Sequence, residues 1–266
     1  MCILAHPDDE SLGMGPSLVK YGRQGVTLSV VTATRGERGR FFDNSNRPDH
    51  ATVGRTREAE LREASRVLGV NRLYFLDYID GDLDKADPRE AIAKIAACIR
   101  TERPHVIATF GPEGGYGHPD HIAISQFAGA AIVCAADPAY SGTDTVAVSQ
   151  QPHAVSKFYY MAWTEPQWRA YQSAFKDLKT TVDGVERRAM PFPDWAVTTR
   201  VDTTDCVETV WKAIHCHKTQ LSIYENLDRL SPEHKHAIFG EQEFYRVFSA
   251  VNGGRKVESD LFEGLR

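Results

Sequence analysis

The 266-residue sequence has no long hydrophobic run and no cluster of basic residues. Its longest apolar stretch, Phe127 to Ala136, is half as long as the ~20 residues that a membrane-spanning helix needs. Acidic residues outnumber basic ones, 36 against 31, so the net charge is −5. A nucleic-acid-binding protein usually carries a basic face. These features argue against a membrane span and against a nucleic-acid partner.

Cysteine is also scarce. The five cysteines are odd in number and scattered along the chain, which favours free thiols in a reducing compartment over a disulfide framework. The first fifteen residues hold several charged or polar side chains, including His6 and Asp8, and as written they do not resemble a secretory signal. We therefore expect a cytoplasmic location.

Apolar residues make up 42% of the chain and charged residues 25%, enough for a core and a solvated surface. In the first half, strand-like and helix-like patterns alternate. We expect strands at 2–5, 26–32, 72–76 and 106–109, and helices at 15–24, 55–68, 88–102 and 118–136. This alternation predicts a Rossmann-like, three-layer α/β fold with a mostly parallel central sheet. The first strand is short, so we suspect a native start upstream of Met1.

The second half is less regular. We expect strands at 156–163 and 196–201, a helix at 203–217, and a lid or wall at 165–194. The chain shows no repeat of solenoid length and no stretch typical of a flexible linker. We therefore predict a single domain over 1–266, with a core of about 1–150 and an extension of about 151–266 that contributes to a substrate wall.

Two similar turns follow the first and the fourth predicted strands. They read Ala5-His6-Pro7-Asp8-Asp9-Glu10 and His118-Pro119-Asp120-His121. Each proline keeps the preceding histidine out of the helical region and suits the first turn of a helix that follows. In a doubly wound sheet these two strands are commonly neighbours, and ligands bind in the crevice beyond their ends. The two turns are therefore expected to face each other.

Two imidazoles and a carboxylate make a three-ligand metal site that leaves a position open for water. The turns contain no thiolate, so Fe²⁺, Mn²⁺ or Co²⁺ could replace Zn²⁺. A single aspartate after a strand is more often only a helix cap, but two such turns together favour a metal site. A Mg²⁺-binding signalling domain is another reading. It leaves His6, His118 and His121 unexplained, because Mg²⁺ prefers oxygen ligands.

These turns resemble the motifs of the LmbE/PIG-L family of metal-dependent N-deacetylases. That family carries A-H-P-D-D-E near its start and H-P-D-H after its fourth strand. The likeness extends to Thr34-Arg35-Gly36-Glu37, to Asp80-Gly81, and to Lys212 followed by His217-x-Thr219-Gln220, so it spans most of the chain. The resemblance implies that His6, Asp9 and His121 hold zinc and that Asp8 is the general base.

Further roles follow for residues around the expected metal. The resemblance implies that Tyr116 donates a hydrogen bond to the oxyanion, and that Arg57 and Asp80 bind sugar or inositol hydroxyls. His118 is suitably placed to stabilise the oxyanion, with Asp120 able to orient its ring. Either His118 or the base could return a proton to the leaving amine.

The predicted function is that of a zinc-dependent hydrolase that removes an acetyl group from a small N-acetylglucosaminyl compound by means of activated water. Two alternatives stay open: an amidase that acts on a larger thiol or sugar conjugate, and a non-catalytic metal-binding protein. A homo-oligomer is compatible with the sequence.

Overall fold

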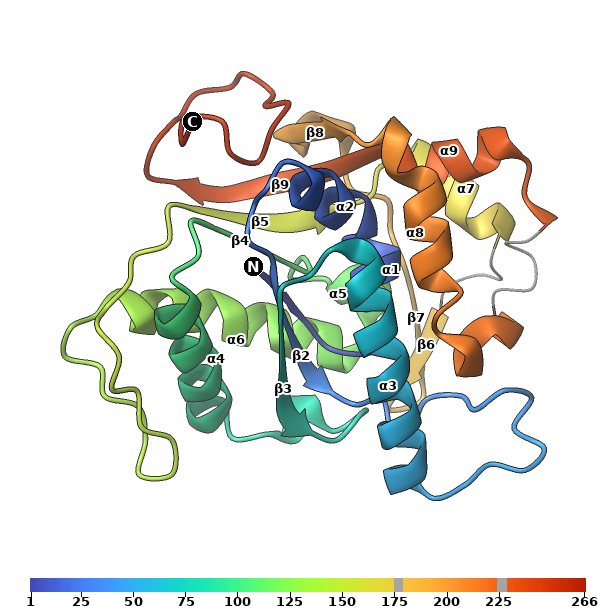
Figure 1. Ribbon diagram of the computed structural model, residues 1–266, viewed down its shortest axis with the longest axis horizontal. Coiled ribbons are helices and arrows are strands. Elements are labelled where there is room, and N and C mark those ends of the chain that lie inside the picture. The colour runs from blue at the N-terminus through green and yellow to red at the C-terminus, as the bar shows by residue number, and fades with distance from the viewer. Residues whose placement is uncertain (175–178, 224–228) are drawn as a thin grey trace.

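The computed structural model describes residues 1–174, 179–223 and 229–266. A seven-stranded sheet with the order β3-β2-β1-β4-β5-β9-β8 forms its centre (Figure 1). Its strands are β1 (Cys2–Leu4), β2 (Ser29–Thr34), β3 (Arg72–Tyr78), β4 (Val106–Thr109), β5 (Lys157–Ala162), β8 (Thr199–Asp202) and β9 (Glu241–Ser249). A separate hairpin consists of β6 (Lys179–Val182) and β7 (Val185–Arg188).

Strand β1 lies between β2 and β4 and runs parallel to both. Strand β3 continues the parallel pairing on one side and β5 on the other. Every residue of β1, β2 and β4 is buried, as expected for parallel strands that helices cover on both faces. The strand order reverses between β1 and β4. The predicted α/β fold with a mostly parallel sheet is confirmed.

Helices cover both faces of the sheet, with α4 and α6 packed together on one face and α2, α3 and α8 on the other (Figure 1). The α-helices are α1 (Asp9–Gly13), α2 (Gly15–Arg23), α3 (His50–Leu68), α4 (Pro88–Glu102), α5 (Gly114–Gly117), α6 (Pro119–Ala136), α7 (Glu165–Ala174), α8 (Val207–Ile214) and α9 (Pro232–Phe239). Short 3₁₀ turns lie at η1 (Leu83–Lys85), η2 (Asp194–Ala196), η3 (Thr204–Cys206) and η4 (Lys218–Ile223). Within the described residues, no helix is both long and apolar enough to cross a membrane.

Two boundaries in the first half differ from the prediction. Helix α3 begins at His50 instead of residue 55, because the Asp49 side chain caps it by accepting a hydrogen bond from the Thr52 amide at 2.7 Å. Strand β2 runs over 29–34 instead of 26–32. It extends toward its carboxyl end because the amide of Thr34 still donates to the carbonyl of Ala5.

The second half differs more. The helix expected at 203–217 is a 3₁₀ turn followed by the shorter α8, and the strand expected at 196–201 is β8 at 199–202. The expected wall at 165–194 contains α7 and the β6–β7 hairpin, while residues 175–178 of it lie outside the described residues. The sequence pattern predicts neither α9 nor β9. Charged residues interrupt the alternation of β9, and they are tolerated because they are paired in the folded chain.

A buried carboxylate ties the antiparallel part of the sheet together. Glu258 accepts hydrogen bonds from Lys157 of β5 at 2.6 Å, from Thr199 of β8 at 2.6 Å and from Tyr159 of β5 at 2.7 Å. Its side chain is almost fully buried, as is that of Lys157. Burial by itself raises the pKa of Glu258, but hydrogen bonds from Lys157, Thr199 and Asn252 outweigh it and lower the pKa to about 2.

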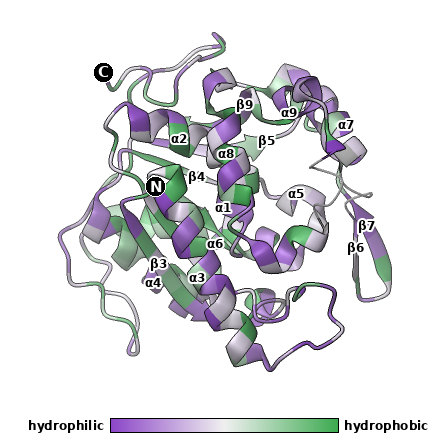
Figure 2. Ribbon diagram, turned by 45° about the vertical axis from the view of Figure 1, so that its right-hand side comes forward, coloured by the Kyte–Doolittle hydropathy of each residue, from purple (hydrophilic) through white to green (hydrophobic). Residues whose placement is uncertain are grey.

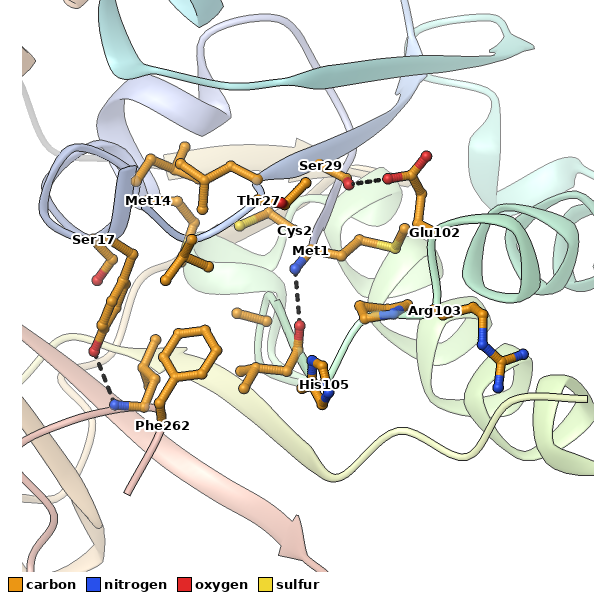
Figure 3. Close-up of a pocket in the computed structure, with 18 residues that line it drawn as sticks. Met1, Cys2, Met14, Ser17, Thr27, Ser29, Glu102, Arg103, His105 and Phe262 are labelled. Carbon is orange, nitrogen blue, oxygen red and sulfur yellow. Dashed lines mark hydrogen bonds between the residues drawn. The ribbon is translucent and has the colours of Figure 1, made fainter. Parts of the chain in front are cut away.

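A cavity of about 460 Å³ opens at the amino-terminal edge of the parallel strands (Figure 3). Met1, Ser29 and Val106 line it at the starts of β1, β2 and β4. The Met1 amine donates a hydrogen bond to the Val106 carbonyl at 2.8 Å. Among the described residues that line this cavity, none is a predicted site residue, because those follow the opposite ends of the strands.

Glu258→Gln should lower the free energy of unfolding by about 3–5 kcal/mol near neutral pH, because it leaves the buried Lys157 ammonium without its oppositely charged partner. The native pKa of Glu258 lies below the usual value of about 4.3. The stabilisation is therefore complete above about pH 4.3 and is lost as the pH falls toward 2. Urea titrations should show the difference between wild type and variant shrinking over that range.

Glu263→Gln serves as the control, because its carboxylate pairs with Lys256 at the surface at 3.6 Å. It should change stability by less than about 1 kcal/mol. An equal loss of unfolding free energy in the two variants would show that the buried Glu258 cluster stabilises the fold no more than a surface ion pair does.

Candidate metal centre and catalytic site

The two histidine-containing turns meet where β1 and β4 end. His6 lies between β1 and α1, and His118 is the residue that caps α6, with Pro119 in the first helical turn. The rings of His6, His118 and His121 lie within 5.1 Å of one another, measured between centroids. Residues more than 100 positions apart thus share one buried cluster, as the parallel pairing of β1 with β4 predicts.

The three predicted ligands, His6, Asp9 and His121, point toward a common centre. His6 Nδ1 lies 3.2 Å from His121 Nε2 and 3.7 Å from Asp9 Oδ2, and His121 Nε2 lies 3.5 Å from Asp9 Oδ1. Around a tetrahedral zinc ion with bonds of about 2.0–2.1 Å, neighbouring ligand atoms are separated by about 3.4 Å. The nitrogen–nitrogen distance, and the distance from each nitrogen to one of the two Asp9 oxygens, are close to that separation.

The other ring nitrogens of the two histidines are already engaged. His121 Nδ1 faces the Gly114 carbonyl at 3.2 Å, so Nδ1 carries the proton. The lone pair of Nε2 is therefore available to bind a metal ion. His6 Nε2 faces Asp120 Oδ2 at 2.9 Å and Asp80 Oδ1 at 3.1 Å, which leaves Nδ1 toward the centre. Hydrogen bonds of this kind orient metal-binding imidazoles and raise their basicity.

Two further groups have ligand atoms close enough to hold an ion: His6 with His118 and His121, and His6 with Asp80 and Asp120. The second group would use His6 Nε2, the nitrogen that faces two carboxylates and therefore carries the proton. Burial alone would lower the pKa of His6, but hydrogen bonds to Asp120 and Asp80 raise it well above its ordinary value. The ring is thus a hydrogen-bond donor on that side.

Asp120 does not orient His118 through its side chain. Its carboxylate accepts hydrogen bonds from the amides of Gly81 at 2.7 Å and Leu83 at 3.1 Å, in addition to its contact with His6. The backbone amide of Asp120 donates to His118 Nδ1 at 3.2 Å. Because His118 Nδ1 accepts, a neutral His118 ring carries its proton on Nε2. Burial is the largest cause that lowers the pKa of His118, to about 4.

Asp8 has an unusual backbone conformation, with φ 107° and ψ −25°. Such a conformation costs a non-glycine residue about 1–3 kcal/mol and needs support from its surroundings. Arg57 supplies part of it, since its guanidinium donates to the carbonyl of Pro7 at 2.5 Å and to Asp8 Oδ2 at 3.1 Å. Arg57 is buried and also donates to the carbonyl of Gly36. The structure thus places Arg57 behind the turn, and its expected contact with substrate stays a prediction.

Asp80 lies in the site, but its carboxylate faces His6. Burial raises the pKa of Asp80, whereas hydrogen bonding to His6 and the charge of His6 lower it, and the lowering prevails. Glu37, a buried residue of the Thr34–Glu37 segment, accepts a hydrogen bond from the Asp80 amide at 3.2 Å. The sequence motif includes Glu37 but assigns it no role. Its buried carboxylate holds the loop that carries Asp80.

Tyr116 completes one side of the cluster, with its ring 5.5 Å from that of His121 and 5.8 Å from that of His118. Burial, together with the charges of Asp9 and Asp8, raises the pKa of Tyr116 above its ordinary range, so the hydroxyl keeps its proton. Trp163 packs against the same turn, near Gly115. The hairpin β6–β7 contacts α5, which carries Tyr116 (Figure 2).

Three tryptophans near the site lie in two different environments. Trp163 and Trp168 stack with Tyr171 in nearly parallel planes, with centroids 5.8 to 6.4 Å apart, and Trp168 is buried. Trp195 is 87% exposed. Stacked, buried aromatic rings are typical of a packed core. Sequence alone could not separate these two environments.

Fold and site together define an α/β protein with a His/Asp centre at the switch point of its sheet. The family described as PIG-L, GlcNAc-PI de-N-acetylase, matches residues 1–132. The chain is 33% identical to 1D-myo-inositol 2-acetamido-2-deoxy-alpha-D-glucopyranoside deacetylase from Kineococcus radiotolerans, over 98% of this chain and 81% of that protein. The chain therefore belongs to the PIG-L family. The predicted enzyme class, a deacetylase that hydrolyses an amide bond, is confirmed by the named relatives.

Solved structures with this fold include N,N'-diacetylchitobiose deacetylase from Pyrococcus horikoshii, with a TM-score of 0.68 at 24% identity, covering 92% of this chain and 82% of that one. They also include 4-carboxy-2-hydroxymuconate hydratase from Pseudomonas putida, with a TM-score of 0.70 at 19% identity, covering 95% and 98%. A deacetylase and a hydratase thus share the fold. At these identities the likeness concerns the fold alone, and the chemistry has to be argued from the site.

Asp120→Asn should weaken metal binding about 10–100-fold, because it changes the group that orients His6. Competition with a chelating dye measures the dissociation constant directly. Asp137→Asn, at the other end of α6, is the matched control and should bind metal as the wild type does. An unchanged constant for Asp120→Asn would show that His6 is oriented without this carboxylate.

Proposed function

We propose that this chain is a zinc-dependent hydrolase that removes the acetyl group from an N-acetylglucosaminyl compound. The observation that carries the proposal is the arrangement of His6 Nδ1, His121 Nε2 and the Asp9 carboxylate beside the separate carboxylate of Asp8. The two nitrogens lie 3.2 Å apart, and each lies 3.5 to 3.7 Å from one of the two Asp9 oxygens. When bound to these residues, a divalent ion would polarise an amide carbonyl and lower the pKa of water to about 7.

Asp8 is proposed as the general base. It neighbours the ligand Asp9 in sequence, yet it lies outside the proposed ligand set. Its Oδ2 is held by Arg57 at 3.1 Å, which fixes the direction of the carboxylate. A carboxylate in this position can take a proton from the attacking water, a role worth about 10²–10⁴-fold in rate.

The developing oxyanion needs donors besides the ion. His118 offers its Nε2–H, because its Nδ1 already accepts from the amide of Asp120. Tyr116 offers a hydroxyl that keeps its proton. A neutral His118 with a single N–H acts as a donor and has no spare proton. We therefore assign the return of a proton to the leaving amine to Asp8, which has just accepted one.

The proposed substrate follows from the relatives, several of which are named for a 2-acetamido-2-deoxy-glucopyranoside linked to inositol. Asp80 is proposed to contact a sugar or inositol hydroxyl at the edge of the site. We propose one domain over 1–266, in which residues from about 151 onward form the substrate wall. The contact of the β6–β7 hairpin with α5 supports this arrangement. A cytoplasmic location fits the five free cysteines.

The central experiment measures acetate release and metal content on the same preparation, with a panel of N-acetylglucosaminyl compounds that includes the inositol-linked one. Release should depend on the metal and stop with a chelator, and added Zn²⁺ should restore it. Bound metal with no release from any amide in a broader panel would contradict the proposed hydrolase and favour a metal-binding role.

Two variants separate the proposed roles. Asp8→Asn should keep its metal and lose about 10²–10⁴-fold in kcat, because only the base is removed. His121→Ala should lose metal and activity together. An Asp8→Asn protein with near-normal turnover would overturn the assignment of the base while leaving the metal site intact.

A further inference from the structure

A buried chain of hydrogen bonds links Asp8 to a histidine more than 200 residues away. The amide of Asp8 donates to Glu10 Oε2 at 2.9 Å. The other oxygen of that carboxylate, Oε1, contacts His217 Nε2 at 2.7 Å and accepts from the Ser11 hydroxyl at 2.6 Å. Glu10, Ser11 and His217 are essentially inaccessible to solvent. These contacts are therefore not in competition with water.

The same peptide group is held on both of its edges. The peptide between Pro7 and Asp8 has its carbonyl bound by Arg57 and its N–H bound by Glu10. Asp8 follows this peptide with φ at 107°. A non-glycine residue stays in such a conformation only when its surroundings fix it. With the peptide plane fixed, the direction of the Asp8 side chain from the backbone is fixed as well.

His217 is itself firmly placed. It lies between α8 and η4, and two residues after it Thr219 donates to Glu60 through its amide at 2.8 Å and its hydroxyl at 2.7 Å. Gln220 donates to the carbonyl of Arg40 at 2.6 Å. These bonds anchor the segment against α3 and the loop before it. His217 is thus a fixed donor for Glu10.

We infer that Glu10 and His217 are positioning residues, which hold the Pro7–Asp8 peptide so that the Asp8 carboxylate points into the site. The inference rests on the proposed role of Asp8 as the base. Without His217, Glu10 Oε1 would keep only the Ser11 hydroxyl as a donor, so the buried carboxylate would shift. Its bond to the Asp8 amide would then weaken, and the strained backbone could relax.

A buried pair of this kind could also serve stability alone, so the test compares variants that separate the two effects. His217→Ala removes the donor, and His217→Gln replaces the ring with a shorter side chain that keeps an N–H group. Thr219→Val removes the hydroxyl bond to Glu60 but keeps the amide bond, which still anchors the segment that carries His217, and it does not touch Glu10 or Asp8. It is the matched control for a loss of stability in the same segment.

For His217→Ala we expect a fall in kcat of about 10²-fold, the scale seen when a catalytic group is misplaced by about 1 Å. KM and metal content should stay close to the wild type. Hydrogen exchange of the Asp8 amide in the metal-loaded protein should become faster. His217→Gln should recover much of the lost kcat and of the amide protection. Thr219→Val should lower Tm without changing either.

Glu10→Gln and Glu10→Ala form a second pair. The amide oxygen of glutamine can still accept from the Asp8 N–H, so Glu10→Gln should retain more turnover than Glu10→Ala at equal metal content. The inference is overturned if His217→Ala keeps both kcat and the protection of the Asp8 amide. It is also overturned if the loss of kcat in each variant simply follows its loss of Tm, with Thr219→Val on the same line.

These experiments distinguish a failure of the positioning role from a failure of the proposed function. If Asp8→Asn remains active, the assignment of the base fails, but amide exchange still decides whether His217 holds the Asp8 peptide. If Asp8→Asn is inactive and His217→Ala is fully active with a protected amide, the proposed function stands and the positioning role is wrong.

Discussion

The parallel pairing of β1 with β4 is the constraint on which the rest of the site depends. Two turns that lie more than 100 residues apart each follow one of these strands, and their side chains meet only because both strands end at the same edge of the sheet. Parallel strands of this kind require crossover helices, which also bury the sheet on both faces. The site therefore lies at the end of the buried, parallel part of the sheet.

Several charged side chains are gathered in this buried site, and backbone amides stabilise two of its carboxylates by hydrogen bonds. Asp9 accepts hydrogen bonds from the amides of Ala5 and His6, and Asp120 accepts from those of Gly81 and Leu83. Buried carboxylates need such partners, because unpaired charge in the interior is costly. The amides come from the turns themselves, so the geometry of each turn also fixes the direction of its carboxylate.

Two buried polar residues of the second half of the chain illustrate how it supports the site. Glu258, near the carboxyl end of the chain, joins β5 to β8 and so completes the sheet beyond its parallel part. His217 reaches the turn after β1 through Glu10. Both contacts are made by charged or polar groups with almost no solvent exposure. The C-terminal half therefore contributes to the frame of the site as well as to its surroundings.

The sequence by itself determined the α/β class and the chemistry that the two turns can support. Buried strands and amphipathic helices can be recognised from local periodicity, and the His-Pro-Asp turns contain residue types that bind metal ions. Helix and strand limits depend on more than hydrophobic periodicity, because the Asp49 side chain caps α3 and a charged residue of β9 is paired with one of β8. Only the tertiary structure decided which partner each polar group meets. It placed Asp120 against His6 rather than His118, and Arg57 behind Asp8, because hydrogen-bond partners across distant segments leave no mark on local spacing.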